Sequence, residues 1–292
     1  MRFDTPMQFA VAFRFLASAF AAAVFVTLAI KPELRAALLA QFNDPVSLPA
    51  LPGDARVHFE PAARPCAEAV AAALPGAVAK IEAEHGRPFA KAPIVGVFAD
   101  YPSYARANGL GDDNIAGVSR AGRAMLSPVL CQSESWRIAS VLTHELSHVH
   151  FFGWRPRGAA RPPQWFTEGL AVLASDGGAA ETVSDEAAAQ AIRNGYRIIL
   201  DESAWMNFLS IPFVAEPPCG GGCTPASFRQ RMAYRQAAIF IGWLRRTDPG
   251  AFSRLMRALE SGAPFAAAFK DAFGDSPQRR WAAFVTSLQA SR

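Results

Sequence analysis

The sequence predicts an α+β fold in which a lobe built around a mixed sheet precedes a mainly helical lobe. Between residues 56 and 127, short apolar and β-branched segments alternate with a helical pattern, whereas the periodic segments after residue 134 have helical spacing. The chain has 292 residues, of which 51% are hydrophobic and 18% are charged. A chain of this length and composition can bury a large core.

The N-terminal segment is strongly apolar. Residues 7–30 contain one charged residue, Arg14, and residues 15–30 contain none. This run is long for the core of a signal peptide and slightly short for a membrane span. No small-residue cleavage site follows it, so we expect residues 1–40 to be a retained transmembrane anchor, with a cleaved signal segment as the alternative. Either would export the remaining chain to the periplasm or extracellular space.

The segment after this anchor has the composition of a linker. Residues 41–56 contain three prolines and one glycine and lack helical periodicity. We therefore expect the folded domain to cover residues 57–292, with the sheet lobe at about 57–152 and the helical lobe at about 153–292.

The sheet lobe is expected to begin with a strand at residues 56–59. A helix at 66–85, interrupted near Pro75, and a strand at 94–98 follow, and then a strand pair at 116–120 and 123–127 around the turn Ala121-Gly122. Helices are expected at residues 134–152, 163–174, 184–200, 227–246, 251–260 and 264–289, the last divided near Gly274.

Four cysteines follow the apolar segment: Cys66, Cys131, Cys219 and Cys223. An even number in an exported domain predicts up to two disulfides. Cys219 and Cys223 can close a small loop, which leaves Cys66 to pair with Cys131. A four-thiolate zinc site or free buried thiols are the alternatives.

The charge pattern argues against a nucleic-acid partner. The formal net charge is +4, but Lys and Arg are scattered along the chain and form no dense run. A mildly basic surface also suits an anionic membrane.

The sequence His144-Glu145-Leu146-Ser147-His148 lies within the helix expected at residues 134–152. Residues four apart share one face of a helix, so both imidazoles can point at one metal ion, with Glu145 beside them. Imidazole nitrogens suit Zn²⁺, and a catalytic zinc site needs a third protein ligand and an open position. Glu168, twenty residues after His148 on the next expected helix, is the best candidate for this ligand.

The motif HELSH followed by WFTEGLA resembles the gluzincin branch of zinc peptidases, the thermolysin and aminopeptidase-like group of the peptidase MA-like superfamily. This resemblance implies a zincin-like fold with an active-site helix in the mixed-sheet lobe. It also implies zinc ligands at His144, His148 and Glu168 and a general base at Glu145. The expected reaction is cleavage of a peptide or protein substrate by zinc-activated water, as in an endopeptidase.

The same resemblance places a hydroxyl donor at Tyr234, which would stabilise the oxyanion of the tetrahedral intermediate. His150 is an alternative donor, but it points to another face of its helix. Thermolysin-like sites carry an Asp four residues after the Glu ligand, where Val172 stands here. The partner that orients His144 is therefore open, with Asp176 or a backbone carbonyl as candidates.

Other functions remain possible on the same motif. The missing Asp would suit a catalytically weak or inactive zinc-bearing module that binds peptides or envelope proteins. A metal-dependent amidase acting on non-peptide substrates is a further alternative. Intramembrane proteolysis is disfavoured, because HELSH has polar flanks and only one segment approaches membrane length. The aminopeptidase motif GxMEN is missing, which argues against aminopeptidase activity.

Overall fold

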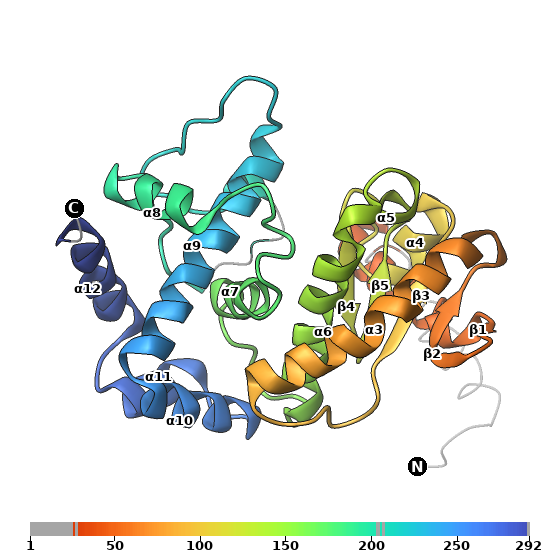
Figure 1. Ribbon diagram of the computed structural model, residues 1–292, viewed down its shortest axis with the longest axis horizontal. Coiled ribbons are helices and arrows are strands. Elements are labelled where there is room, and N and C mark those ends of the chain that lie inside the picture. The colour runs from red at the N-terminus through yellow and green to blue at the C-terminus, as the bar shows by residue number, and fades with distance from the viewer. Residues whose placement is uncertain (1–25, 27–28, 203–204, 206–207, 291–292) are drawn as a thin grey trace, which may run out of the picture.

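The computed structural model describes residues 26, 29–202, 205 and 208–290. Within them the α+β class is confirmed: a mixed sheet and its covering helices form one lobe, and helices form the other. Figure 1 shows the sheet lobe on the right and the helical lobe on the left, with α6 (Ile138–Trp154) and α7 (Gln164–Ala174) between them.

Among the described residues, five strands form one sheet in the order β1-β2-β3-β5-β4. Their bounds are Ala50–Leu51, Asp54–Phe59, Ile94–Val97, Gly117–Arg120 and Arg123–Leu126 for β1 to β5. Strands β2, β3 and β5 are parallel, and β1 and β4 are antiparallel edge strands. The expected strand pair is confirmed, with positive φ angles at both turn residues, Ala121 (50°) and Gly122 (77°). Such angles match the twist of a two-residue hairpin.

Helices cover both faces of the sheet. Helix α3 (Arg64–His85) and α6 bury Leu74 and Leu146 against one face, together with strand residues such as Val95. On the other face, α4 (Tyr101–Asn108) packs Tyr104 against Met125, and α2 (Pro32–Phe42) packs on α4. The short helix α5 (Pro128–Gln132) follows β5.

Two expected boundaries in the sheet lobe differ from the structure. Helix α3 continues through Pro75, because buried residues on both sides of it hold the helix against the sheet. Residues 41–56, expected to be a linker, contain the 3₁₀ helix η1 (Pro45–Ser47), strand β1 and the start of β2. Pairing of β1 with β2 makes this segment part of the fold, so the folded part begins before Arg56.

The helical lobe is built around an aromatic core. Beyond α7 it contains α8 (Asp185–Arg193), α9 (Pro225–Thr247), α10 (Pro249–Glu260), α11 (Phe265–Phe273) and α12 (Pro277–Ala290). Trp165 of α7 contacts Phe240 of α9 and Phe265 of α11. Helix α8 ends earlier than the expected residue 200, because Gly195 adopts a φ of 90° just after it.

Both expected disulfides are present, Cys66–Cys131 and Cys219–Cys223. The first joins α3 to α5, and the second closes the loop before α9.

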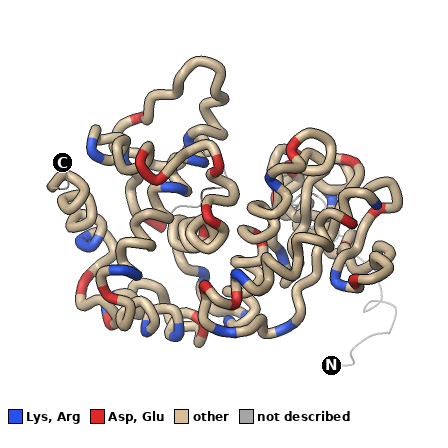
Figure 2. Tube along the Cα trace, viewed as in Figure 1, with Lys and Arg blue, Asp and Glu red and all other residues tan. Residues whose placement is uncertain are grey.

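In the described part of the chain, no helix is long and apolar enough to cross a membrane. Most of the expected anchor, residues 1–25 and 27–28, lies outside the described residues. Lys and Arg are interspersed with Asp and Glu over both lobes (Figure 2).

Candidate metal centre

Helix α6 carries the HELSH motif and is buried along most of its length. Val141, Leu142 and Leu146 pack into the core of the sheet lobe. His144 and His148 lie on the side of α6 that meets the helical lobe, and their exposed fractions are 2% and 7%. The helix is therefore held rigidly by its apolar residues while it presents two imidazoles to the junction of the lobes.

Three atoms meet at this junction in a nearly equilateral triangle. Nε2 of His144 lies 3.2 Å from Nε2 of His148 and 3.2 Å from Oε2 of Glu168. Nε2 of His148 lies 3.3 Å from the same carboxylate oxygen. Ligands about 2.0–2.1 Å from a tetrahedral zinc ion lie about 3.3–3.4 Å from one another. The chain thus places two nitrogens and one oxygen at the separations of three tetrahedral ligands.

Helix α7 positions Glu168 against α6. Gly169 allows the close approach of α9, because a Cβ there would lie 2.7 Å from the backbone carbon of Ala237. Gln164, one turn before Glu168, donates from Nε2 to Oε1 of the glutamate at 3.3 Å. The side-chain oxygen Oε1 of Gln164 accepts from the backbone N–H of Trp205 at 2.8 Å. These contacts hold one carboxylate oxygen and leave Oε2 facing the histidines.

A backbone carbonyl orients His144. Nδ1 of His144 donates to the carbonyl oxygen of Gly178 at 3.0 Å. Asp176, the other candidate, instead pairs with Lys80, and its side chain is 79% exposed. The Gly178 carbonyl therefore orients His144 in place of the missing Asp.

The turn containing Gly178 is fastened to the start of α6. A Cβ at Gly178 would lie 2.3 Å from the carbonyl oxygen of Ser140, so only glycine fits there without movement. Glu181 binds Arg137 at 3.0 Å and accepts from the Ser140 hydroxyl at 3.0 Å. These contacts fix the position of the Gly178 carbonyl relative to His144.

Glu145 lies next to the histidines and against the edge strand β4. A Cβ at Gly117 would lie 2.9 Å from Cγ and 3.0 Å from Oε1 of Glu145. Burial raises the pKa of the Glu145 carboxyl, and the nearby His144 and His148 oppose this increase only in part. A carboxylate with a raised pKa is a better proton acceptor near neutral pH.

Tyr234 of α9 completes the site from the helical lobe. Its ring stacks parallel to that of His144, with centroids 6.2 Å apart, and Trp205 stacks near the tyrosine ring at 5.9 Å. Burial and the charge of Glu168 raise the pKa of Tyr234 well above its usual value. Its hydroxyl therefore keeps its proton at neutral pH and remains a hydrogen-bond donor.

Burial and charge act in opposite directions on the pKa values of Glu168 and His148. Burial alone would raise the pKa of Glu168, but the charge of His148 and hydrogen bonds from both histidines hold it well below its usual value. Burial alone would lower the pKa of His148, but Glu168 raises it overall. The attraction that favours a proton on His148 therefore competes with a metal ion, which binds the unprotonated imidazole nitrogen.

His150 lies away from the three ligand atoms. It is fully buried, and its Nε2 donates to the carbonyl oxygen of Arg87 at 3.0 Å. Its ring packs edge-on against His85 at a centroid distance of 4.6 Å. The structure thus places this alternative donor under α3 rather than in the site.

Sequence reasoning missed Gly117, Gln164 and Gly178. Gln164 could have been found, because a residue four positions before Glu168 on a helix lies on the same face. The two glycines carry no local signal, because their roles depend on distant segments that approach them.

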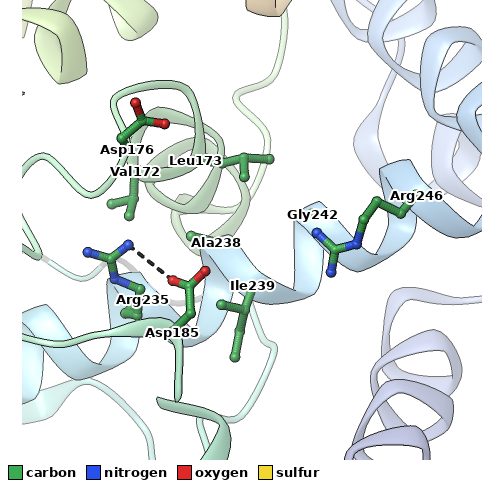
Figure 3. A pocket seen from close by; sticks show the side chains of 9 residues that line it. All are labelled: Val172, Leu173, Asp176, Asp185, Arg235, Ala238, Ile239, Gly242 and Arg246. Atoms are coloured by element: carbon green, nitrogen blue, oxygen red, sulfur yellow. Dashed lines mark hydrogen bonds and ion pairs between the residues drawn. The ribbon is translucent and has the colours of Figure 1, made fainter. Parts of the chain in front are cut away.

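A separate cavity of about 380 Å³ lies between α7, α8 and α9 (Figure 3). Its lining residues are Val172, Leu173, Asp176, Asp185, Arg235, Ala238, Ile239, Gly242 and Arg246. Asp185 pairs with Arg235 at 3.1 Å across it. None of the three ligand candidates lines this cavity.

No family model matches the chain, and neither a curated protein nor a solved structure matches it.

Proposed function

We propose that the chain is a zinc-dependent metallohydrolase with a zincin-like fold, and that it cleaves peptide bonds in the manner of a gluzincin endopeptidase. His144, His148 and Glu168 hold the zinc ion. A peptide or protein segment is the substrate, bound where the two lobes meet.

The observation that carries this proposal is the triangle of ligand atoms. Its edges of 3.2, 3.2 and 3.3 Å fit a tetrahedral ion with one open position. Two imidazoles and one carboxylate form a donor set that suits zinc. The buried setting supports this assignment, because a buried carboxylate is costly without positive charge beside it, which a metal ion held by the two imidazoles would supply.

A zinc ion bound here supplies an activated water and polarises the carbonyl group of the substrate. Glu145 accepts the proton of the attacking water and later delivers it to the leaving amine. Tyr234 donates a hydrogen bond to the carbonyl oxygen as negative charge develops on it. Gly178 and Gln164 act indirectly, because they orient His144 and Glu168.

Metal analysis and peptide cleavage by the full chain test this proposal together. We expect about one zinc ion per chain in both the wild type and Glu145→Gln, because Glu145 is not a ligand. Cleavage of a broad peptide library should fall about 100-fold or more in Glu145→Gln, as expected for loss of a general base. Glu68→Gln, an exposed change on α3, is the matched control and should cleave normally.

A folded wild-type chain that takes up no zinc would refute the metal site. Zinc binding with equally negligible cleavage by the wild type and Glu145→Gln, but tight binding of peptides, would instead favour the non-catalytic module. The missing Asp motivated that rival, and the Gly178 carbonyl weakens it by orienting His144 in its place. Cleavage only of non-peptide amides would favour the amidase.

Export and membrane anchoring form a separate part of the proposal. They rest on the uncharged sequence of residues 15–30 and on the two disulfides, which are typical of oxidising compartments. Fractionation of cells that express the full chain should recover it with the membrane.

A further inference from the structure

Helix α2 attaches to the sheet lobe through its smallest side chains. Ala36 and Ala40 are buried, with exposed fractions of 7% and 0%. A Cβ at Gly111 would lie 3.3 Å from that of Ala36, and one at Gly109 would lie 3.5 Å from that of Ala40. The inner face of α2 therefore docks closely and contributes no large apolar side chain to the core.

The opposite face of α2 carries large apolar side chains. Leu34, Leu38 and Phe42 are exposed by 47%, 44% and 78%. At about 100° per residue, Leu38 lies about 180° from the midline of the two alanines, and Leu34 and Phe42 lie about 40° to either side of it. This arrangement is the reverse of an ordinary surface helix, which buries its large apolar residues and exposes small or polar ones.

The charges on α2 also depend on the face. Arg35 is exposed and lies about 60° from Leu38 around the helix, and the exposed Lys31 directly precedes the helix. Glu33, the acidic residue of the helix, lies about 140° from Leu38 and close to the inner face. Basic residues next to exposed apolar ones suit a face at the level of lipid headgroups, because long basic side chains can reach the phosphates while their stems stay in apolar surroundings.

We propose that the outer face of α2, defined by Leu34, Leu38 and Phe42, lies on the surface of a lipid bilayer and docks the sheet lobe onto it. The sequence before α2 identifies this occupant, because residues 15–30 are uncharged and only Lys31 separates them from the helix. A chain whose preceding segment enters a bilayer brings α2 to the same surface. Contact with lipid then buries the apolar area of the outer face, which is otherwise exposed to water.

Helix α2 is firmly tied to the rest of the lobe. The guanidinium of Arg120 on β4 donates to the carbonyl oxygen of Ala40 at 3.1 Å and to that of Ala37 at 3.5 Å. Just after the helix, Asp44 pairs with Arg123 of β5 at 3.3 Å. Lipid contact at α2 therefore fixes the orientation of the whole sheet lobe relative to the membrane. This inference rests on the proposed membrane anchoring and needs no catalytic activity.

Fluorescent probes on the full chain in lipid vesicles test the proposal. The four native cysteines are paired in disulfides, so a thiol-reactive, polarity-sensitive probe reacts only with an introduced cysteine. Leu38→Cys places the probe on the outer face, and Glu33→Cys places it on the same helix but away from that face. Vesicles of phosphatidylcholine with a minority of phosphatidylglycerol contain either nitroxide-labelled lipid or external iodide as quencher.

We expect lipid nitroxide to quench the Leu38→Cys probe several-fold more than the Glu33→Cys probe, and iodide to show the opposite order. If only the distance from residues 15–30 along the chain mattered, lipid nitroxide would quench the Glu33→Cys probe more than the Leu38→Cys probe, because Glu33 lies nearer to that segment. Equal quenching at both positions, or free access of iodide to the Leu38→Cys probe, would overturn the proposal.

Protection of the Leu38→Cys probe from both quenchers would also overturn it, because the face would then be covered by protein, such as a second copy. Leu34→Cys repeats the measurement on the same face should the first variant fold poorly. Zinc content and peptide cleavage, measured on the same samples, report separately on the proposed enzyme.

Discussion

The imidazole of His144 donates from Nδ1 to the carbonyl oxygen of Gly178 at 3.0 Å. Because Nδ1 is committed to this bond, Nε2 is the ring nitrogen that faces Glu168 and His148 and is available to a metal ion. The contact crosses from α6 to the turn after α7, so the geometry of the ligand set depends on how that turn is held.

We expect Gly178→Ala to weaken zinc binding about 10- to 100-fold, the usual effect of losing a group that orients a ligand. The added Cβ would lie 2.3 Å from the carbonyl oxygen of Ser140, so the turn must move and take its own carbonyl away from His144. Competition with a chromophoric chelator measures the zinc affinity. Gly76→Ala is the matched control, because nothing lies within 4 Å of its new Cβ. Equal affinities in the two variants would show that the Gly178 carbonyl does not orient His144.

Gly117→Ala should impair turnover without removing the metal. Its Cβ would lie 2.9 Å from Cγ of Glu145, which forces the carboxylate to move. Because a shift of about 1 Å in a reacting group can lower a rate about 100-fold, we expect kcat to fall about 10- to 100-fold with zinc content unchanged. Gly153→Ala on α6, whose Cβ would make only an ordinary contact, should leave kcat intact. A normal kcat in Gly117→Ala would contradict the assigned position of Glu145.

The sequence was sufficient to predict which three side chains meet at the candidate metal centre, because the relevant spacing is local. His144 and His148 share a face of one helix, and the next helix carries Glu168. Helix periodicity likewise predicted α6, α7, α9 and α10 to within a few residues.

Contacts between distant segments could not be predicted in this way. Gly117 is 28 residues from Glu145 and Gly178 is 34 residues from His144, and neither glycine belongs to a local motif. Helix α2 was missed because residues 1–40 were assigned to the anchor, and strand β1 because the prolines and glycine of residues 41–56 indicated a linker. Both elements are held by tertiary packing, which the local sequence does not show. The turn at Gly195 shortened α8, although the apolar pattern continued to residue 200.

Tyr234→Phe isolates the role of one hydroxyl. Phenylalanine keeps the ring stacked between His144 and Trp205, so zinc binding and folding should be preserved. If the hydroxyl stabilises the oxyanion, we expect kcat to fall about 100-fold or more with little change in KM. Steady-state kinetics on a peptide found in the library screen would separate these effects. An unchanged kcat would assign Tyr234 to packing alone.

His85 should make the free energy of unfolding depend on pH. Its Nε2 bonds to the Ser147 hydroxyl at 3.0 Å, and its Nδ1 is buried without a partner. Burial, together with the nearby charges of His150, His148 and Arg245, lowers the pKa of His85 from 6.5 to about 3. Between these values the unfolded chain binds the proton and the folded chain does not, so the free energy of unfolding decreases as the pH falls.

At about pH 5 this linkage amounts to at most about 2 kcal/mol relative to about pH 7.5. His85→Gln cannot take up a proton and keeps a polar group near Ser147, so its free energy of unfolding should decrease less over the same range. Urea titrations of the metal-free full chain in mild detergent, followed by tryptophan fluorescence, measure both proteins at each pH. If the free energy of unfolding decreased by the same amount in the wild type and in His85→Gln, His85 would be protonated equally in the folded and unfolded chains. The buried Nδ1 without a partner argues against this result.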